Sequence, residues 1–215
     1  MTNISISCVV KQYISITPHN RVNIEGYGGD EISRTVTIIS VEEAPLKITD
    51  ITSDIEDKIK YALKTKKKGR EYTLEIKNRS TKEDSFKGTM ELKTNSEKKP
   101  QLFLFISGLI REEIVVDSKS IYFGTIDTTK ETFNASSLER TITLQDVRGV
   151  GLNIKKLKSS SNWIVPESNK KGRNYTIVVR LDKNKLPRGR FEEKIEIYTN
   201  YKKKSLIIEV KGEII

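Results

Sequence analysis

Apolar and polar side chains alternate along most of this chain. Residues 175–180 read YTIVVR, so that Tyr175, Ile177 and Val179 would lie on one side of an extended backbone. Alternation of period two in stretches rich in Ile, Val, Thr and Tyr predicts β-strands. No segment keeps a helical period beyond two turns, and the strongest candidate, residues 55–64, also fits a strand. The pattern therefore predicts an all-β protein.

Turn residues separate the alternating segments. Gly28-Gly29-Asp30, Lys171-Gly172 and Pro187-Arg188-Gly189 supply glycine, proline or aspartate at the breaks. In the second half of the chain we expect strands near residues 114–117, 121–124, 138–145, 151–158, 162–166, 174–181, 192–199 and 205–213. Seven or eight short strands at this spacing are typical of an immunoglobulin-like sandwich. Trp163 is expected to fill the space between its two sheets.

The chain also matches itself. SRTVTI at residues 33–38 matches ERTITL at 139–144, and KKGREYTLEI ending at Ile76 matches KKGRNYTIVV ending at Val179. MELKTN ending at Asn95 matches IEIYTN ending at Asn200. These blocks keep their order at shifts of about 105 residues, which indicates an internal duplication. We therefore predict two tandem immunoglobulin-like β-sandwich domains, at residues 13–110 and 111–215.

The first residues, 1–12, form a further expected strand. Residues 4–17 align without gaps to residues 104–117, which contain the last strand of the first repeat. Ile4 to Val10 would then be the last strand of a preceding repeat in a longer array, or a strand that adds to a sheet edge. A strand that only packs on the first domain is an equal alternative.

Composition excludes several classes of protein. The 215 residues are 32% charged and 35% hydrophobic, too apolar for a disordered chain, and no apolar segment is long enough to span a bilayer. No signal peptide is visible, so the protein is cytoplasmic or a signal was removed. One cysteine, Cys8, and one histidine, His19, cannot form an intrachain disulfide or a Cys/His zinc site. No nucleophile elbow, phosphate-binding loop or metalloprotease motif is present, so we expect neither an enzyme nor a cofactor.

Motifs shared by the repeats resemble those of ASH/HYDIN-type immunoglobulin-like domains and of the bacterial DUF1573 family. In the second repeat the matching residues are Phe123, Gly124, Gly151, Leu152, Ile154, Thr199, Asn200, Val210 and Gly212. The first repeat keeps Pro45, Leu46, Ile48, Thr94, Asn95 and Gly108, but has Ile24-Glu25-Gly26 in place of Phe-Gly. The resemblance implies a scaffold or protein-interaction role and favours a bacterial periplasmic or extracellular location.

This chain lacks a cysteine motif that many bacterial members of that family carry. Many bacterial members carry a Ser-Cys-Gly-Cys motif after the third strand, whereas this chain has Ser159-Ser160-Ser161-Asn162. A metal or redox role tied to those cysteines is therefore not supported.

Basic residues gather in equivalent hairpins of the two repeats, and the formal net charge is +10. The topology predicts that these hairpins form one basic tip on each domain. The expected tip residues are Lys66, Lys67, Lys68, Arg70, Lys98 and Lys99 in the first repeat and Lys170, Lys171, Arg173, Lys202, Lys203 and Lys204 in the second.

Three explanations for these tips stay open. The lysines could be hydrated hairpin residues that keep strand edges from pairing. They could bind nucleic acid or an acidic glycan, although we expect no exposed aromatic series for base stacking. They could instead face an acidic pole of the first repeat in an end-to-end array. That pole would comprise Asp30, Glu31, Asp54, Glu56, Asp57, Glu83 and Asp84.

The function predicted from the sequence is a non-enzymatic structural or protein-interaction module, within a larger or extracytoplasmic assembly. Its expected partners are proteins, with end-to-end self-association as one form. The alternative function is polyanion binding through the basic tips.

Overall fold

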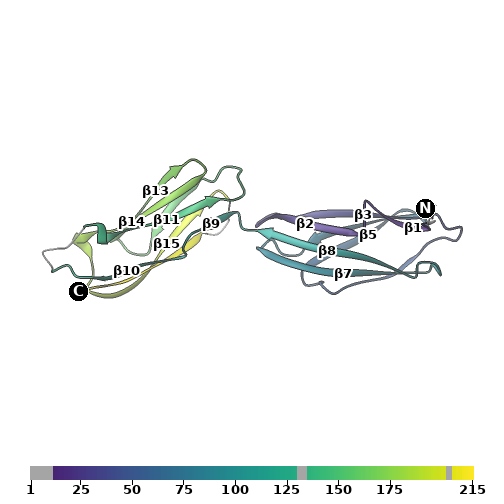
Figure 1. Ribbon diagram of the computed structural model, residues 1–215, viewed down its shortest axis with the longest axis horizontal. Helices are drawn as coiled ribbons and strands as arrows, with labels where there is room; N and C mark the ends of the chain where they lie inside the picture. Colours follow the sequence, from purple (N-terminus) through teal and green to yellow (C-terminus); the bar gives the residue numbers. More distant parts are fainter. Residues whose placement is uncertain (1–11, 130–134, 202–204) are drawn as a thin grey trace, which may run out of the picture. The chain divides into compact units, whose positions relative to one another are not determined.

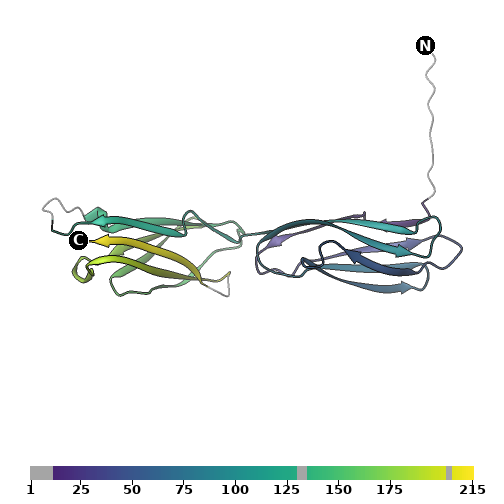
Figure 2. The same ribbon diagram turned by 90° about the horizontal axis from the view of Figure 1, so that it is seen from below.

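The computed structural model describes residues 12–129, 135–201 and 205–215. The chain divides into two compact units, the first ending at Arg111 and the second spanning Glu112–Ile215. Figures 1 and 2 show that the strands of each unit form two layers. The predicted all-β fold with two immunoglobulin-like sandwiches is confirmed.

The described part of the first unit has eight strands in two four-stranded sheets. They are β1 (Ile14–Thr17), β2 (Arg21–Tyr27), β3 (Ser33–Ser40), β4 (Ile48–Ser53), β5 (Ile59–Lys67), β6 (Glu71–Asn78), β7 (Asp84–Thr94) and β8 (Gln101–Arg111). One sheet has the order β1-β3-β6-β5 and the other β2-β8-β7-β4. All neighbours are antiparallel except β2 and β8, which run parallel.

The second unit repeats this topology strand for strand. It contains β9 (Ile114–Val116), β10 (Ser120–Ile126), β11 (Glu139–Asp146), β12 (Ile154–Ser159), β13 (Ile164–Lys171), β14 (Asn174–Leu181), β15 (Gly189–Thr199) and β16 (Leu206–Ile214). Its sheets have the orders β13-β14-β11-β9 and β10-β16-β15-β12, and β10 again runs parallel to β16. Two short 3-10 helices, η1 (Ala135–Leu138) and η2 (Lys183–Lys185), lie in connections. Neither helix in the described part of the chain could cross a membrane.

Alternate side chains of each strand fill the space between the sheets. In β6, Tyr72, Leu74 and Ile76 are buried, and in β14 the buried residues include Tyr175, Ile177 and Val179. Each unit has its own apolar core. Trp163 is 7% exposed and packs edge-on against Phe191, with ring centroids 5.0 Å apart. Its predicted place in the core is therefore confirmed.

The strands agree with the expected positions except at their ends. The segment predicted at residues 162–166 is longer, because β13 runs on to Lys171. Gly69 and Gly172 have φ values of 69° and 63°, a left-handed conformation that glycine adopts without a steric penalty. Because such tight turns need few residues, Lys66, Lys67, Lys170 and Lys171 end their strands. The prediction that they lie in the turns was wrong.

A phenylalanine covers a glycine at the same place in both units. Phe86 in β7 lies opposite Gly108 in β8, and Phe191 in β15 lies opposite Gly212 in β16. A methyl group added at Gly108 would overlap the Phe86 ring, and one at Gly212 would lie 2.7 Å from the Phe191 ring. Each glycine therefore provides the space that the facing ring occupies.

This contact predicts that Gly108→Ala destabilises the protein. The methyl group must displace the Phe86 ring, and such overpacking costs about 1–3 kcal/mol of unfolding free energy. Urea unfolding measures the loss. In a Phe86→Leu background the substitution should cost much less, because the smaller side chain leaves room. An equal cost in both backgrounds would contradict the role assigned to the ring.

Candidate interaction surfaces

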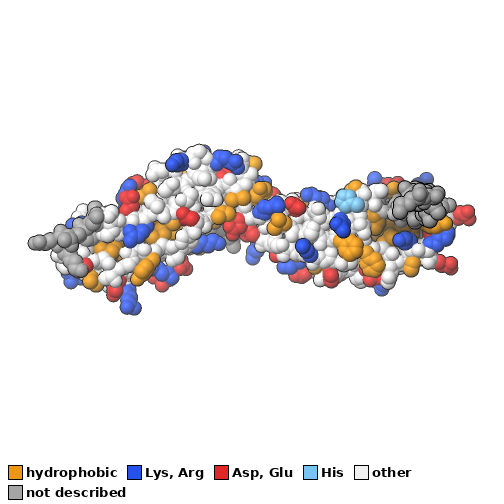
Figure 3. Space-filling view, in the orientation of Figure 1, with side chains coloured by type: hydrophobic (Ala, Val, Ile, Leu, Met, Phe, Trp, Pro, Cys, Tyr) orange, Lys and Arg blue, Asp and Glu red, His pale blue; other side chains and the backbone are white. Residues whose placement is uncertain are grey.

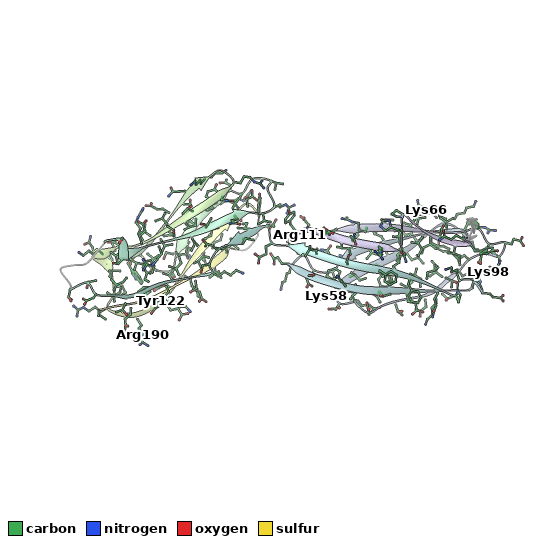
Figure 4. The ribbon with its side chains drawn as sticks, in the orientation of Figure 1. Lys58, Lys66, Lys98, Arg111, Tyr122 and Arg190 are labelled. Atoms are coloured by element: carbon green, nitrogen blue, oxygen red, sulfur yellow. The ribbon has the colours of Figure 1, made fainter. Side chains whose placement is uncertain are left out.

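The basic hairpins of the first unit lie at one end of its sandwich. Figure 4 shows Lys66 and Lys98 at this end and Lys58 and Arg111 at the other. The connection between β3 and β4 ties the two hairpins together. The Arg70 guanidinium donates hydrogen bonds to the carbonyl oxygens of Glu42 and Glu43, and the Ser96 hydroxyl donates one to the Glu42 carboxylate, 2.8 Å away.

The charge at this end is mixed. Lys66 forms an ion pair with Glu71 at 3.8 Å, and the Lys98 ammonium lies 3.7 Å from the centre of the Tyr13 ring. A hollow of about 650 Å³ between the two loops contains Glu42, Glu43 and Glu97 besides Lys98. Lys67, Lys68 and Lys99 are exposed. The structure therefore places acids among the predicted basic residues of this tip.

The corresponding end of the second unit is organised around a buried aspartate. Asp146 ends β11 and is 6% exposed. Its carboxylate accepts hydrogen bonds from the backbone N–H groups of Gly149, Gly151 and Leu152 at 2.7–3.3 Å, and from the Tyr201 hydroxyl at 3.0 Å. The loop from β11 to β12 is thus wrapped around one negative charge.

These hydrogen bonds also set the ionisation of Asp146. Burial alone would raise its pKa, but the hydrogen bonds from Gly149, Leu152, Tyr201 and Gly151 outweigh burial, and the pKa lies below its ordinary value. The second buried acid at this end, Glu113, is paired with Arg148 at 2.7 Å. Both acids therefore hold the loop in place and add no exposed negative charge.

The cations of the second tip remain accessible. Lys170, Lys171 and Arg173 are exposed, and Lys170 lies 5.7 Å from the centre of the Tyr175 ring. None of the three has an ion pair within the described part of the chain. Lys202, Lys203 and Lys204 lie outside the described residues. The second tip is thus the more basic of the two.

The predicted acidic pole lies at the other end of the first unit, where its loops are joined by hydrogen bonds. The Asn78 side chain accepts a hydrogen bond from the backbone N–H of Ile32 and donates one to the carbonyl oxygen of Asp30. The backbone N–H of Gly28 donates a hydrogen bond to the carbonyl oxygen of Arg111. The pole residues lie in or beside these loops: Asp30 and Glu31 before β3, Asp54, Glu56 and Asp57 before β5, and Glu83 and Asp84 at the start of β7.

Lysines neutralise part of this pole. Lys58 pairs with Asp84 at 2.9 Å and with Asp57 at 3.7 Å, while Lys60 and Lys77 reach Glu31. The hydrogen bond between Lys58 and Asp84 raises the pKa of the lysine and lowers that of the aspartate. The hypothesis that this pole faces the second basic tip stays a prediction.

An exposed aromatic pair lies on the outer face of sheet β2-β8-β7-β4. Phe103 is 42% exposed and Phe105 50% exposed, both on β8. Figure 3 shows hydrophobic side chains gathered on this face among basic ones. Arg21, Asn23, Lys87 and Phe105 contribute to the lining of a hollow of about 670 Å³ there. The expectation that no exposed aromatic series exists was wrong, because residues 102–106, LFLFI, are apolar on both faces of the strand.

Residues that could bind a metal do not converge in the described part of the chain, which contains no cluster of three or more His, Cys, Asp or Glu side chains. His19 is exposed and lies beside a hollow with Phe103 and Phe105. Cys8 and the expected N-terminal strand lie outside the described residues, except for Gln12, which belongs to no strand.

Comparison with known proteins finds no matching family model and no matching curated protein. A protein of unknown function from Porphyromonas gingivalis W83 is 12% identical, with 94% of this chain and 100% of that one covered and a TM-score of 0.35. The ASH/PapD-like domain 7 of human CEP192 is 11% identical over 52% of this chain and 99% of its own, with a TM-score of 0.35. Cadherin-like domains 1 to 4 of zebrafish RET are 10% identical over 94% of this chain and 51% of theirs, with a TM-score of 0.40.

Asp146→Asn is predicted to destabilise the second unit. The amide cannot accept the same set of hydrogen bonds, and unfolding free energy should fall by about 1–3 kcal/mol. Fluorescence of Trp163, the only tryptophan in the sequence, follows unfolding of this unit.

The dependence on pH gives a second test of Asp146. Because its folded pKa is below the unfolded value of about 3.9, its contribution is present above that pH and is lost as the pH falls through the folded pKa. The wild type should therefore lose more stability than Asp146→Asn below about pH 4. Parallel pH profiles would show that the carboxylate charge does not stabilise the loop.

Proposed function

We propose that this chain is a non-enzymatic protein-interaction module in which two immunoglobulin-like sandwiches present different surfaces. The exposed pair Phe103 and Phe105 carries this proposal. Exposed aromatic side chains on a sheet face, with a cation beside them, are typical of surfaces that bind other proteins.

The two buried carboxylates of the second unit support a structural role. Asp146 and Glu113 are buried, and both stabilise the same loop through Gly149, Leu152 and Arg148. A catalytic carboxylate would need access to a substrate, and neither acid has it. This use of the buried acids is the reason for proposing that the chain is not an enzyme.

Kinship with ASH/HYDIN-type domains and with the DUF1573 family remains part of the proposal. It rests on motif residues that occupy structural positions: Leu152 is buried in the core, and Gly212 faces Phe191. The same resemblance supports a place in a larger or extracytoplasmic assembly.

Photo-crosslinking tests the proposed function. Benzoylphenylalanine placed at Phe105 in the native host should form a specific covalent adduct with a protein. The matched control places it at Glu209, the equivalent residue of the second unit, which pairs with Lys211. The purified adduct partner should then bind the wild-type chain saturably. Absence of any protein adduct at Phe105, or equal adducts at both positions, would count against the proposal.

Polyanion binding is the second candidate function, and the second basic tip favours it. Lys170, Lys171 and Arg173 are exposed while Glu113 and Asp146 are buried, so anions would meet mainly positive charge. Binding through such residues releases counterions and weakens as salt rises.

A salt titration with duplex DNA and heparin tests this candidate. The variant Lys170→Gln/Lys171→Gln/Arg173→Gln should bind both polyanions more weakly. For DNA, the slope of log binding constant against log salt concentration should decrease in magnitude by up to about three, one for each lost cation. The matched variant Lys66→Gln/Lys67→Gln/Lys68→Gln should lose less, because acids surround the first tip. No binding by the wild type at about 150 mM salt would remove this candidate.

A further inference from the structure

The outer face of sheet β2-β8-β7-β4 has a regular arrangement of side chains. Three rows cross the sheet where residues pair between strands. Phe105 lies between Arg21 and Thr89, Phe103 lies beside Glu91, and Ser107 lies between Asn23 and Lys87. Paired residues point to the same face, and successive rows are about 7 Å apart along β8. The aromatic row is thus flanked by a row with a carboxylate and a row with a lysine.

The second unit carries charged side chains at the positions that correspond to Phe105 and Ser107. With Gly108 and Gly212 as equivalent positions, Phe105 corresponds to Glu209 and Ser107 to Lys211. Lys211 pairs with Glu209 at 2.9 Å and with Glu192 at 3.0 Å. The fold therefore allows ion pairs at these outward positions, and in the described part of the first unit neither Arg21 nor Lys87 beside Phe105 forms one.

The two cations nearest Phe105 lack partners in the described part of the chain. Arg21 and Lys87 are exposed, and neither has an ion pair or side-chain hydrogen bond with another residue in the described ranges. The Oε1 atom of Glu91 is buried and has no hydrogen-bond partner there either. A surface with two unpaired cations, a partly exposed carboxylate that has no ion pair in the described ranges and two exposed rings suits a partner that brings the opposite charges and more apolar surface.

We propose that a second copy of this chain covers this face, in a two-fold dimer with the two Phe105 side chains at its axis. The axis would lie between the sheets and run across the strands, so that β7 of one copy faces β7 of the other in the reverse direction. The row of Phe103 then meets the row of Ser107. Glu91 of each copy lies opposite Lys87 of the other, so the two-fold symmetry produces two equivalent ion pairs.

The distance between packed sheets suits this arrangement. Packed sheets lie about 10 Å apart, a space that aromatic side chains from both copies can fill. Arg21 shares the row of Phe105, so the axis places it opposite Arg21 of the second copy. Because β2 is the edge strand of the sheet, each guanidinium can turn toward water at the rim of the interface. This inference rests on the proposed function, because it names the partner and the face that the interaction module would use.

Sedimentation velocity of the whole chain, at concentrations up to about 1 mM, tests the proposal. The wild type should shift from monomer to dimer as concentration rises. Phe105→Glu should raise the dimer dissociation constant about tenfold or more, and it should fold normally because glutamate occupies the equivalent position in the second unit. Tyr122→Glu is the matched control: Tyr122 is an exposed aromatic of the second unit, labelled in Figure 4, and its loss should leave dimerisation unchanged.

A charge exchange tests the two-fold geometry. Lys87→Glu and Glu91→Lys should each weaken the dimer, because each places like charges opposite one another. The double variant Lys87→Glu/Glu91→Lys should recover most of the lost affinity. Recovery supports the assigned register, and a double variant weaker than both single variants would overturn it.

Two outcomes would overturn the second-copy proposal as a whole. One is a wild type that stays monomeric throughout the concentration range. The other is a monomer whose Phe103 and Phe105 are required for binding a labelled oligo(dT) strand, which would indicate a single-stranded nucleic acid site on this face. A monomeric chain that crosslinks a different protein at Phe105 would contradict this inference and still support the proposed function.

Discussion

Alternate side chains of every strand are committed to the space between two sheets, and this constraint governs what the rest of each unit can do. Leu74 and Ile76 in the first unit, like Ile177 and Val179 in the second, are fully excluded from solvent. An inward residue cannot change without leaving a cavity or a clash. The outward residues are under no such restriction. The two units therefore share their inward residue types and differ on their surfaces.

The β3–β4 loop of the first unit and the β11–β12 loop of the second are held in place by different side chains. In the first unit the β3–β4 connection is held by Arg70, which donates to backbone carbonyls, while Lys98 lies over the Tyr13 ring. In the second unit Asp146 occupies the position of Ser40, since both pair with the first residue of the opening strand. Because its carboxylate accepts the loop N–H groups directly, the second unit uses its acids internally and leaves its cations exposed.

The sequence predicted the fold well because the fold depends on local alternation and on turns. Tyr175, Ile177 and Val179 show their inward direction in the sequence, and the duplicated blocks supply an internal alignment. Strand ends were less accurate, since the tight turn at Gly172 lets β13 run on to Lys171.

The candidate surfaces were predicted less completely, because they depend on residues that are distant in the sequence. Two of the acids around Lys98, Glu42 and Glu43, come from the β3–β4 connection, more than 50 positions away. The exposure of Phe103 and Phe105 was not predicted, because residues 102–106 are apolar on both faces of the strand. Such a pattern is typical of a strand that is buried on both sides. The pairing of β8 with β2 and β7 shows which face is covered.

The duplication makes the exposed face of the first unit informative in a way that a single domain would not be. Sequence alone cannot distinguish an exposed phenylalanine that is tolerated from one that is used, because single exposed apolar residues are common. Here the equivalent strand, β16, also has apolar inward residues and the same glycine, but its outer face carries Glu209 and Lys211, which pair with each other. A stable sheet of this topology therefore does not need an aromatic side chain at the position of Phe105. Since the core does not require Phe105, the proposed contact with a second copy would supply a physical reason for its position.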